Sequence, residues 1–355
     1  MSARKPTTYR DAGVDLDAAD QLVQRIGPAV RSTYGPQVLP SHGGFAGCFR
    51  LDHDNRLFAG TLRDPVLVSC TDGVGSKVLI AAHTNRYDTV GIDLVAMSVN
   101  DLLTCGAQPL FFLDYIAIPR LDPERVATLV EGVAAGCKLA GCALLGGETA
   151  EMPDLYHRDH FDLAGFAVGV VDRERMLDSR RVRPGDLLIG LPSSGLHANG
   201  YSLVRRLLLR RAGLRLDRAA PGLGRPLGDV LLEPTTIYVR PVLTALAHYR
   251  RRPPIHAMAH ITGGGLPGNL PRVLPGNCDA VVERGSWSIP PIFGLIEHYG
   301  VDEEEMYRVF NMGIGFVLIT RARSAATIQR LLERAGTTPR IIGRIRRGRG
   351  RVEIR

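Results

Sequence analysis

The stretch 66–171 alternates short apolar runs rich in β-branched residues with longer runs at helical spacing, and this alternation restricts the fold most. It is typical of an α/β layer architecture rather than of an all-α or all-β fold. The predicted strands are 66–70, 110–117, 142–145 and 161–171, and the predicted helices are 93–105 and 123–140. The second helix begins at an Asp-Pro pair, a typical helix start. Two amphipathic helices should therefore pack on a sheet.

A second domain is predicted after the Arg-dense stretch 172–184, where a boundary is expected. Strands are predicted at 186–191, 280–283 and 310–320, and helices at 201–211 and 235–248. The expected division is 1–172, 173–345 and an Arg-rich tail, 346–355. The similar apolar runs 161–171 and 310–320 indicate that the two domains resemble each other, although a repeat is not established.

Composition narrows the functional classes. With 355 residues and 45% hydrophobic content, the chain can form about two cores. It has no apolar run of membrane-spanning length and no apolar signal core, so we expect a cytoplasmic protein without a membrane partner. The net charge of +8 is concentrated in the Arg-rich ends. Because no aromatic residues are interleaved there, a solvated tail is favoured over nucleic-acid binding. The six cysteines lack zinc-like spacing and should be free, mostly buried thiols.

The segment 71–77, Thr-Asp-Gly-Val-Gly-Ser-Lys, is predicted to leave the first strand as a tight loop. Gly73 and Gly75 let backbone amides approach a ligand, Lys77 suits a phosphate, and Asp72 suits a hard cation. Only three of the 44 basic residues are lysines, so a lysine here stands out. The loop lacks the Walker A pattern. It indicates a metal-nucleotide site, with a plain turn as the alternative.

Two further acidic positions are candidates for the same site. Asp101, beside Asn100, interrupts an apolar helical surface, where it could bind a divalent cation or pair with an arginine. Asp93 is expected only to cap that helix. Glu148 follows a Gly-Gly pair at a predicted strand end, where α/β folds bind ligands, although the same residues could begin a helix.

The second domain carries two polar, glycine-rich segments, 193–201 and 260–265. The first places hydroxyls and an imidazole before a predicted helix, and the second offers amides that can cradle an anion. Together they indicate a phosphorylated substrate. The candidate substrate-binding residues are Ser193, Ser194, His197, Asn199, Thr262, Gly263 and Gly264. Neither G-x-S-x-G nor a suitable cysteine context is present, so covalent catalysis through the protein is not expected.

Taken together, these motifs resemble the aminoimidazole ribonucleotide synthetase family, also called phosphoribosylformylglycinamidine cyclo-ligases. The resemblance covers nearly the whole chain except the tail. The segments that carry it are 9–15, 43–45, 71–77, 91–117, 146–153, 193–203, 234–238, 256–275 and 305–315. One departure lies in the first glycine-rich loop, where Ala46-Gly47 inverts the usual order.

The resemblance implies an α/β fold of α+β type, with an N-terminal sheet that pairs across a homodimer into a β-barrel and a C-terminal α/β domain. It also implies the ATP-dependent ring closure of formylglycinamidine ribonucleotide in de novo purine synthesis. Asp72, Asp101 and Glu148 are assigned to Mg²⁺, and His197, Lys77 and Asp101 to catalysis. The implied ATP-binding residues are Gly43, Gly44, Asp72, Gly73, Gly75, Lys77, Asn100, Asp101 and Glu148. A related small-molecule kinase and a basic RNA-associated protein remain alternatives.

Overall fold

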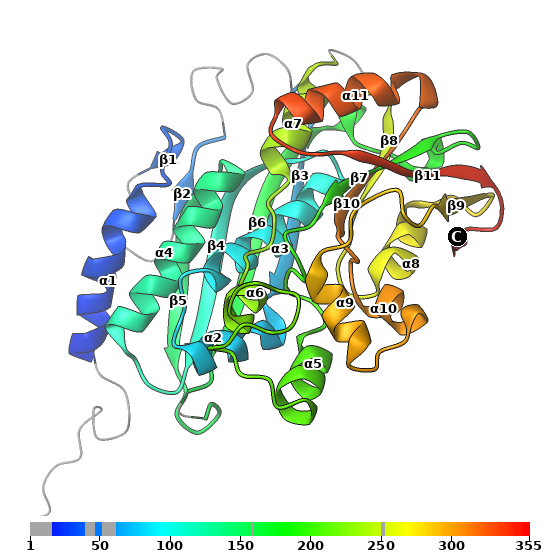
Figure 1. Cartoon of the computed structure of the whole chain (residues 1–355). Coiled ribbons are helices and arrows are strands. Elements are labelled where there is room, and N and C mark those ends of the chain that lie inside the picture. The colour runs from blue at the N-terminus through cyan, green and yellow to red at the C-terminus, as the bar shows by residue number, and fades with distance from the viewer. Residues whose placement is uncertain (1–15, 40–46, 52–61, 158, 250–252) are drawn as a thin grey trace, which may run out of the picture.

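The computed structural model describes residues 16–39, 47–51, 62–157, 159–249 and 253–355. They form two α/β domains side by side, with the N-terminal domain on the left of Figure 1 and the C-terminal domain on the right. Within these ranges, no helix is long and apolar enough to cross a membrane. All six cysteines are free thiols, as predicted, but only three of them are buried and the other three are partly exposed.

The N-terminal domain is built on a four-stranded sheet in the order β3-β6-β4-β5. Only β4 and β5 run parallel, and α4 connects them. The helices of this domain are α1 (Leu16–Arg31), α2 (Val78–Thr84), α3 (Val90–Thr104) and α4 (Pro123–Ala140), with a short 3-10 turn η2 (Gly75–Lys77). The strands are β1 (Val38–Leu39), β2 (Cys48–Phe49), β3 (Pro65–Gly73), β4 (Gln108–Ile118), β5 (Ala143–Glu151) and β6 (Asp162–Asp172).

The predicted helices 93–105 and 123–140 are confirmed, and the Asp122 side chain caps α4 by accepting from two backbone N–H groups. Two strands are longer than predicted. Residues 71–73 belong to β3 rather than to a loop, and 146–151 belong to β5. The glycines that look like strand ends therefore lie inside the sheet, where they give neighbouring strands room.

The C-terminal domain is built on a six-stranded sheet in the order β12-β9-β11-β7-β10-β8. Its strands are β7 (Leu187–Pro192), β8 (Ile255–His260), β9 (Cys278–Val282), β10 (Ile314–Thr320), β11 (Arg340–Arg347) and β12 (Val352–Ile354). Its helices are α5 (Tyr201–Val204), α6 (Leu227–Leu231), α7 (Val239–Ala247), α8 (Gly265–Asn269), α9 (Pro291–His298), α10 (Glu303–Val309) and α11 (Ala322–Arg334). Short 3-10 and π-helical turns complete it: η3 (Arg173–Arg175), η4 (Ser179–Arg181), η5 (Arg205–Arg211) and η6 (Leu270–Val273). The helix expected over 235–248 starts later, because 233–238 is irregular and contacts the other domain.

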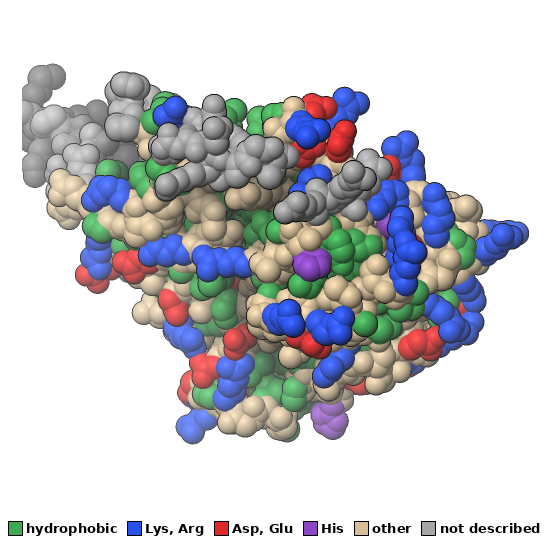
Figure 2. All heavy atoms as spheres, turned by 90° about the horizontal axis from the view of Figure 1, so that it is seen from above, with side chains coloured by type: hydrophobic (Ala, Val, Ile, Leu, Met, Phe, Trp, Pro, Cys, Tyr) green, Lys and Arg blue, Asp and Glu red, His purple; other side chains and the backbone are tan. Residues whose placement is uncertain are grey.

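The segment 346–355 is not a solvated tail, which corrects that prediction. It continues β11 and adds β12 to the sheet. Asp279 on β9 accepts hydrogen bonds from the backbone N–H groups of Arg349 (2.7 Å) and Arg351 (2.9 Å). The Arg346 guanidinium lies 2.6 Å from Glu353. Figure 2 views the molecule from above and shows basic side chains scattered over the C-terminal domain, with acidic ones among them.

Helix α3 joins the two domains. It packs on β3 and β6 of its own sheet and also contacts β8 and α7 of the C-terminal domain. Almost every residue along it is buried, and Asp101 near its end is an exception. Polar side chains on this helix are therefore placed at the contact between the domains.

Candidate functional site

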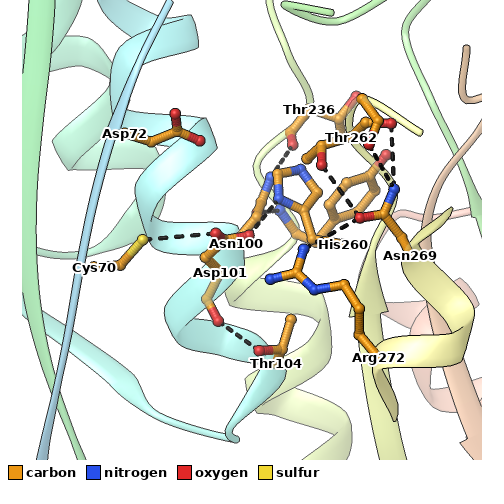
Figure 3. A network of polar contacts seen from close by, with 12 residues as sticks. Cys70, Asp72, Asn100, Asp101, Thr104, Thr236, His260, Thr262, Asn269 and Arg272 are labelled. Carbon is orange, nitrogen blue, oxygen red and sulfur yellow. Dashed lines mark hydrogen bonds and ion pairs between the residues drawn. The ribbon is translucent and has the colours of Figure 1, made fainter. Parts of the chain in front are cut away.

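The candidate site centres on Asp101 of α3 and His260 at the end of β8 (Figure 3). Asp101 Oδ1 lies 2.9 Å from His260 Nδ1. The Asp101 side chain is 37% exposed, whereas that of His260 is almost fully buried. The partner of Asp101 is thus a histidine from the other domain, and not the arginine that was considered as an alternative. Among the described residues, His260 Nε2 has no hydrogen-bond partner.

An open cavity of about 350 Å³ lies between the domains beside this pair. Asp101, His260, Cys70 and Arg272 are among the residues that line it. Cys70 Sγ lies 3.6 Å from Asp101 Oδ2, and burial together with that carboxylate raises the pKa of the Cys70 thiol to about 12. A protonated thiol and an imidazole thus contact one partly exposed carboxylate, and a guanidinium lines the same cavity.

Asp72 faces the same region from β3, on the face of the sheet that α3 covers. Burial raises the pKa of its carboxyl, and the negative charge of Asp101 raises it further. The two acidic groups therefore lie close enough to repel each other. Within the described residues, no three His, Cys, Asp or Glu side chains form a ready metal site. Mg²⁺ is usually held by one or two carboxylates, phosphates and water, so this donor set fits it.

Glu148 does not join these two carboxylates in one chain. It is exposed on β5, and two strands separate β5 from β3. At the usual strand spacing, the backbones of Glu148 and Asp72 are about 14 Å apart. Glu148 instead lines a second cavity, of about 800 Å³, between α1 and β5. Asp114 lines this cavity too, and burial raises the pKa of its carboxyl to about 7.

Lys77 is completely buried, and its ammonium is used inside the protein. Nζ donates to Asp93 Oδ1 at 2.9 Å, to the carbonyl of His197 at 3.1 Å and to the carbonyl of Glu233 at 2.7 Å. These acceptors use all three of its hydrogens, so the described geometry leaves none for a phosphate. Its role towards ATP stays a prediction.

Asp93 does not cap α3, which corrects that prediction. The helix starts three residues earlier, after Thr89, and the Asp93 carboxylate turns to the other domain. Its Oδ1 accepts from the backbone N–H (2.8 Å) and hydroxyl (2.5 Å) of Thr235. Its Oδ2 lies 2.8 Å from Lys77 Nζ. Burial lowers the pKa of Lys77 and raises that of Asp93, and the attraction between them opposes both shifts.

Asn100 makes a second contact with the same C-terminal segment. Its Nδ2 donates to the Thr236 carbonyl (2.9 Å), and its Oδ1 accepts from the Tyr238 N–H (3.0 Å). Both polar ends of Asn100 are thus engaged within the protein. The predicted ATP contact of Asn100 stays a prediction.

His197 is buried in a loop after β7, with a left-handed backbone (φ 60°) that is uncommon outside glycine. Its Nε2 faces the backbone N–H groups of Ser194 (3.3 Å) and Thr236 (3.5 Å), which places the ring hydrogen on Nδ1. Among the described residues, Nδ1 has no hydrogen-bond partner. Burial, and then the neighbouring His260 and Lys77, lower the pKa of His197 well below its usual value. The ring is therefore neutral at pH 7.

The two predicted substrate loops come together. Gly200, Gly263 and Gly264 line one open hollow of about 560 Å³, and Arg308 stands at its rim. Asn269 holds the second loop by donating to the carbonyls of Gly263 (3.2 Å) and Gly265 (2.9 Å).

The remaining predicted residues of these loops have internal partners or lie beside the glycines. Ser193 is buried and donates to the Gly195 carbonyl, and the Ser194 hydroxyl donates to the Pro234 carbonyl. Asn199 lies beside Gly263, and the Thr262 hydroxyl is 3.4 Å from Asn269.

Gly43 and Gly44, predicted to bind ATP, lie outside the described residues. Gly73 ends β3, and Gly75 has a left-handed backbone (φ 65°) at the start of η2. The selected segment 260–265 begins at His260, but no role of its own was predicted for that residue. Arg272 and Thr235 were not predicted as site residues.

The fold belongs to a known class of two-domain proteins. The family model "AIR synthase related protein, N-terminal domain" matches residues 57–171, and "AIR synthase related protein, C-terminal domain" matches 183–355. Among solved structures, thiamine-monophosphate kinase from Stenotrophomonas maltophilia is similar, with a TM-score of 0.65 and 20% identity over 94% of this chain and 95% of that one. HypE from E. coli gives a TM-score of 0.62 and 16% identity over 93% and 92%. These likenesses show the fold.

Closer relatives define the family. The phosphoribosylformylglycinamidine cyclo-ligase of Myxococcus xanthus is 51% identical over 345 residues, 97% of this chain and 97% of the relative. That of Bacillus cereus (strain Q1) is 49% identical over 343 residues, 96% of each chain. The chain belongs to the phosphoribosylformylglycinamidine cyclo-ligase (AIR synthase) family, so the family prediction is confirmed.

Proposed function

We propose that this chain closes the imidazole ring of aminoimidazole ribonucleotide from formylglycinamidine ribonucleotide, using ATP and releasing ADP and phosphate. The observation that carries the proposal is the near-complete alignment, at 51% identity, with a cyclo-ligase. The cleft at Asp101 and His260 supplies a place for phosphoryl chemistry between two domains.

The reaction must overcome a poor leaving group. An amide oxygen leaves badly, so the formyl oxygen of the substrate first attacks the γ-phosphorus of ATP, and ADP departs. The amidine-side nitrogen then attacks the formyl carbon, and the oxygen leaves with the phosphoryl group as inorganic phosphate. The protein contributes position and charge stabilisation rather than a covalent intermediate.

Three groups of residues divide this work. His197, neutral and with the N–H of Nδ1 unpartnered, is a hydrogen-bond donor for a phosphoryl or substrate oxygen. Asn199 and the loop of Thr262, Gly263 and Gly264 hold the ribose phosphate, since the glycines line an open hollow. Ser193 and Ser194 shape the first loop through their internal hydrogen bonds.

Asp72 and Asp101 are the residues that would hold Mg²⁺ with the phosphates of ATP. The support is geometric, because Asp72 lies on the same face of β3 as Cys70, which contacts Asp101, and because Asp101 is partly exposed. The charge of Asp101 also raises the pKa of Asp72. When bound, the cation neutralises charge on the phosphates during transfer. Asp101 then has a second task, because its other oxygen orients the His260 ring. Glu148 lines the α1 cavity, so its part in the ATP site remains a separate proposal.

We also propose that two copies pair through the N-terminal sheet. On the face turned away from α3, the large apolar side chains Leu67, Tyr115 and Phe166 are 59%, 39% and 40% exposed. Aligned residues of β3, β6 and β4 form this face, for example Thr71, Phe166 and Leu113. An exposed apolar sheet face of this kind fits burial against a second copy.

The function is tested by mixing purified protein with formylglycinamidine ribonucleotide, ATP and Mg²⁺ and following ADP and aminoimidazole together. We expect one aminoimidazole for each ADP. ADP with a stable phosphorylated product and no ring would indicate a kinase-like relative instead. Neither product, with ATP shown to bind, would remove the proposed reaction while leaving the fold intact.

Pairing is tested by light scattering on a size-exclusion column. We expect a dimer for the native chain and a monomer for Phe166→Asp, because a charge on this face opposes burial. Leu155→Asp is the matched control, since Leu155 is 76% exposed on a loop outside the sheet. A native monomer would refute the dimer without affecting the reaction assay.

A further inference from the structure

We infer that Lys77, with Asp93, is a positioning pair that fixes the His197 loop of the C-terminal domain against the N-terminal domain, and that Lys77 is not a phosphate ligand. This inference rests on the proposed function, because His197 is placed in the substrate site.

The Lys77 side chain reaches from one domain into the other. Lys77 follows β3 in the N-terminal domain, but two of its three acceptors, the carbonyls of His197 and Glu233, belong to the C-terminal domain. Its side chain is 0% exposed. A phosphate could reach this ammonium only after the contact between the domains opened. A charge buried this deeply is retained because its partners are complete.

The lysine holds the backbone of the His197 loop. The His197 carbonyl belongs to a non-glycine residue with φ 60°, a conformation that carries a backbone cost. The hydrogen bond from Lys77 Nζ to that carbonyl opposes relaxation of the loop. The His197 ring is also held on its other side. The Thr236 N–H faces Nε2, and Cε1 packs so closely on Gly315 that a side chain there would overlap it.

The pair also holds the segment 233–238. Asp93 holds Thr235 through two hydrogen bonds, and Lys77 holds the Glu233 carbonyl. This segment presents Thr236 to the His197 ring. The pair therefore fixes both the backbone of His197 and the segment that orients its imidazole. Loss of either partner should displace the ring, and displacements near 1 Å cost roughly 100-fold in rate.

The experiment compares Lys77→Met and Asp93→Asn with Lys138→Met, which removes an exposed lysine from α4 and serves as the matched control. ATP affinity is measured by calorimetry with Mg²⁺. The kcat is measured in the coupled assay, in which ADP and aminoimidazole are followed together. We expect both pair variants to bind ATP within about threefold of the native chain while kcat falls roughly 100-fold. Lys138→Met should match the native chain in both readings.

A second reading separates positioning from general loss of structure. In protein with ¹⁵N-labelled histidine rings, the His197 signals, assigned from His197→Gln, should shift in Lys77→Met and stay unchanged in Lys138→Met. A rise of tenfold or more in the ATP dissociation constant for Lys77→Met, with native affinity for Asp93→Asn, would overturn the inference and restore Lys77 as a phosphate ligand. Unshifted His197 signals in a folded Lys77→Met protein would overturn it as well.

If both pair variants fail to fold, Thr235→Val supplies the test. It removes one hydroxyl from Asp93 and leaves Lys77 in place. Positioning predicts a lower kcat with unchanged ATP affinity, whereas a phosphate role for Lys77 predicts no change in kcat. An inactive native chain would refute the reaction and not the pair, because the ATP affinities and the His197 signals are read independently of turnover.

Discussion

Two carboxylates on one helix, Asp93 and Asp101, meet the C-terminal domain in different ways. They are eight residues apart on α3, about 12 Å along its axis. Asp93 is fully buried between Lys77 and Thr235. Asp101 touches His260 but keeps 37% of its side chain exposed at the edge of an open cavity. The same residue type on the same helix thus makes one closed contact and one open contact.

The difference lies in which groups are left unpaired. At the closed contact, all three hydrogens of the ammonium have acceptors. At the open contact, His260 Nε2 has no partner among the described residues, and Asp72 adds a second negative charge. A buried charge is tolerated when hydrogen bonds and ion pairs satisfy it, whereas a ligand site needs polar groups without internal partners. Asp93 is therefore enclosed between the domains, whereas Asp101 stays exposed to the cavity.

The largest expected effect comes from Asp101→Asn. It removes the charge proposed to bind Mg²⁺ and weakens the orientation of His260, so we expect kcat to fall by at least about 100-fold. The dependence of rate on Mg²⁺ concentration should move to higher concentrations. Both are read in the coupled assay. Full activity with unchanged Mg²⁺ dependence would rule out the metal role of Asp101.

The next largest effect is on the free energy of unfolding, where substitution of Asp93 should cost more than substitution of Asp101. Asp93→Asn leaves the buried Lys77 ammonium without its counter-charge, which should lower the free energy of unfolding by about 3–5 kcal/mol. Asp101→Asn changes a partly exposed group and should cost about 1 kcal/mol or less. Urea unfolding followed by circular dichroism measures both. Equal losses at the two positions would contradict the distinction between a closed and an open contact.

The sequence predicted the elements whose signals are local. The helix 123–140 was predicted with its observed limits, because its apolar spacing and its Asp-Pro start lie within one segment. Strand β5 was cut short at Gly146, since paired glycines usually end a strand. The structure supplies the reason for the second glycine, because a side chain at Gly147 would overlap the Asp114 carboxylate on β4.

The Arg-rich end shows the converse error. Its charge indicated a solvated tail over 346–355, yet Val352 and Ile354 of β12 are partly buried against the core, with Glu353 between them. That alternation was visible in the sequence and was outweighed by the charge count.

The site divides in the same way. Asp72, Asp101 and the His197 loop were found because polar residues interrupt apolar segments. Lys77 was assigned to ATP because its partners lie 16 to 156 residues away, and no local pattern reports such pairing. His260 lay within the selected segment 260–265 but was given no role, because its role depends on Asp101, 159 residues away. A sequence shows which groups are costly to bury, but not which of them find partners.

Asp114, like Asp93, is a buried acid, but among the described residues no salt bridge to it is found, which sharpens the comparison. Burial raises its pKa to about 7, above the value near 3.9 in an unfolded chain. The stability that this group contributes is fully present below about pH 4 and is lost as pH rises through about 7. The free energy of unfolding should therefore fall over that range by at most about 4 kcal/mol on account of this group.

Asp114→Asn should remove that part of the fall, so the variant should gain stability relative to the native chain as pH rises. Urea unfolding between about pH 5 and pH 8 tests this. Asp154→Asn, at an exposed position in the 152–161 connection, is the control and should leave the pH profile unchanged. Parallel profiles for native and Asp114→Asn protein would show that Asp114 ionises normally in the fold.

The smallest expected effect is a change in the reactivity of Cys70, which reports the charge of Asp101 without catalytic turnover. The Cys70 thiol has a pKa of about 12, partly because Asp101 Oδ2 lies 3.6 Å away. Asp101→Asn should lower that pKa and raise the alkylation rate of Cys70 by iodoacetamide several-fold, because the thiolate is the reactive form. Peptide mass spectrometry follows Cys70, with Cys48 of β2 as the internal reference.

Mg²⁺ added to the native chain should act in the same direction, since a cation at Asp101 offsets the same charge. If Mg²⁺ leaves the Cys70 rate unchanged while Asp101→Asn raises it, the carboxylate is charged and open as described but does not hold the ion in the absence of ATP. The metal would then depend on nucleotide phosphates for most of its ligands, as a site with only two protein carboxylates requires.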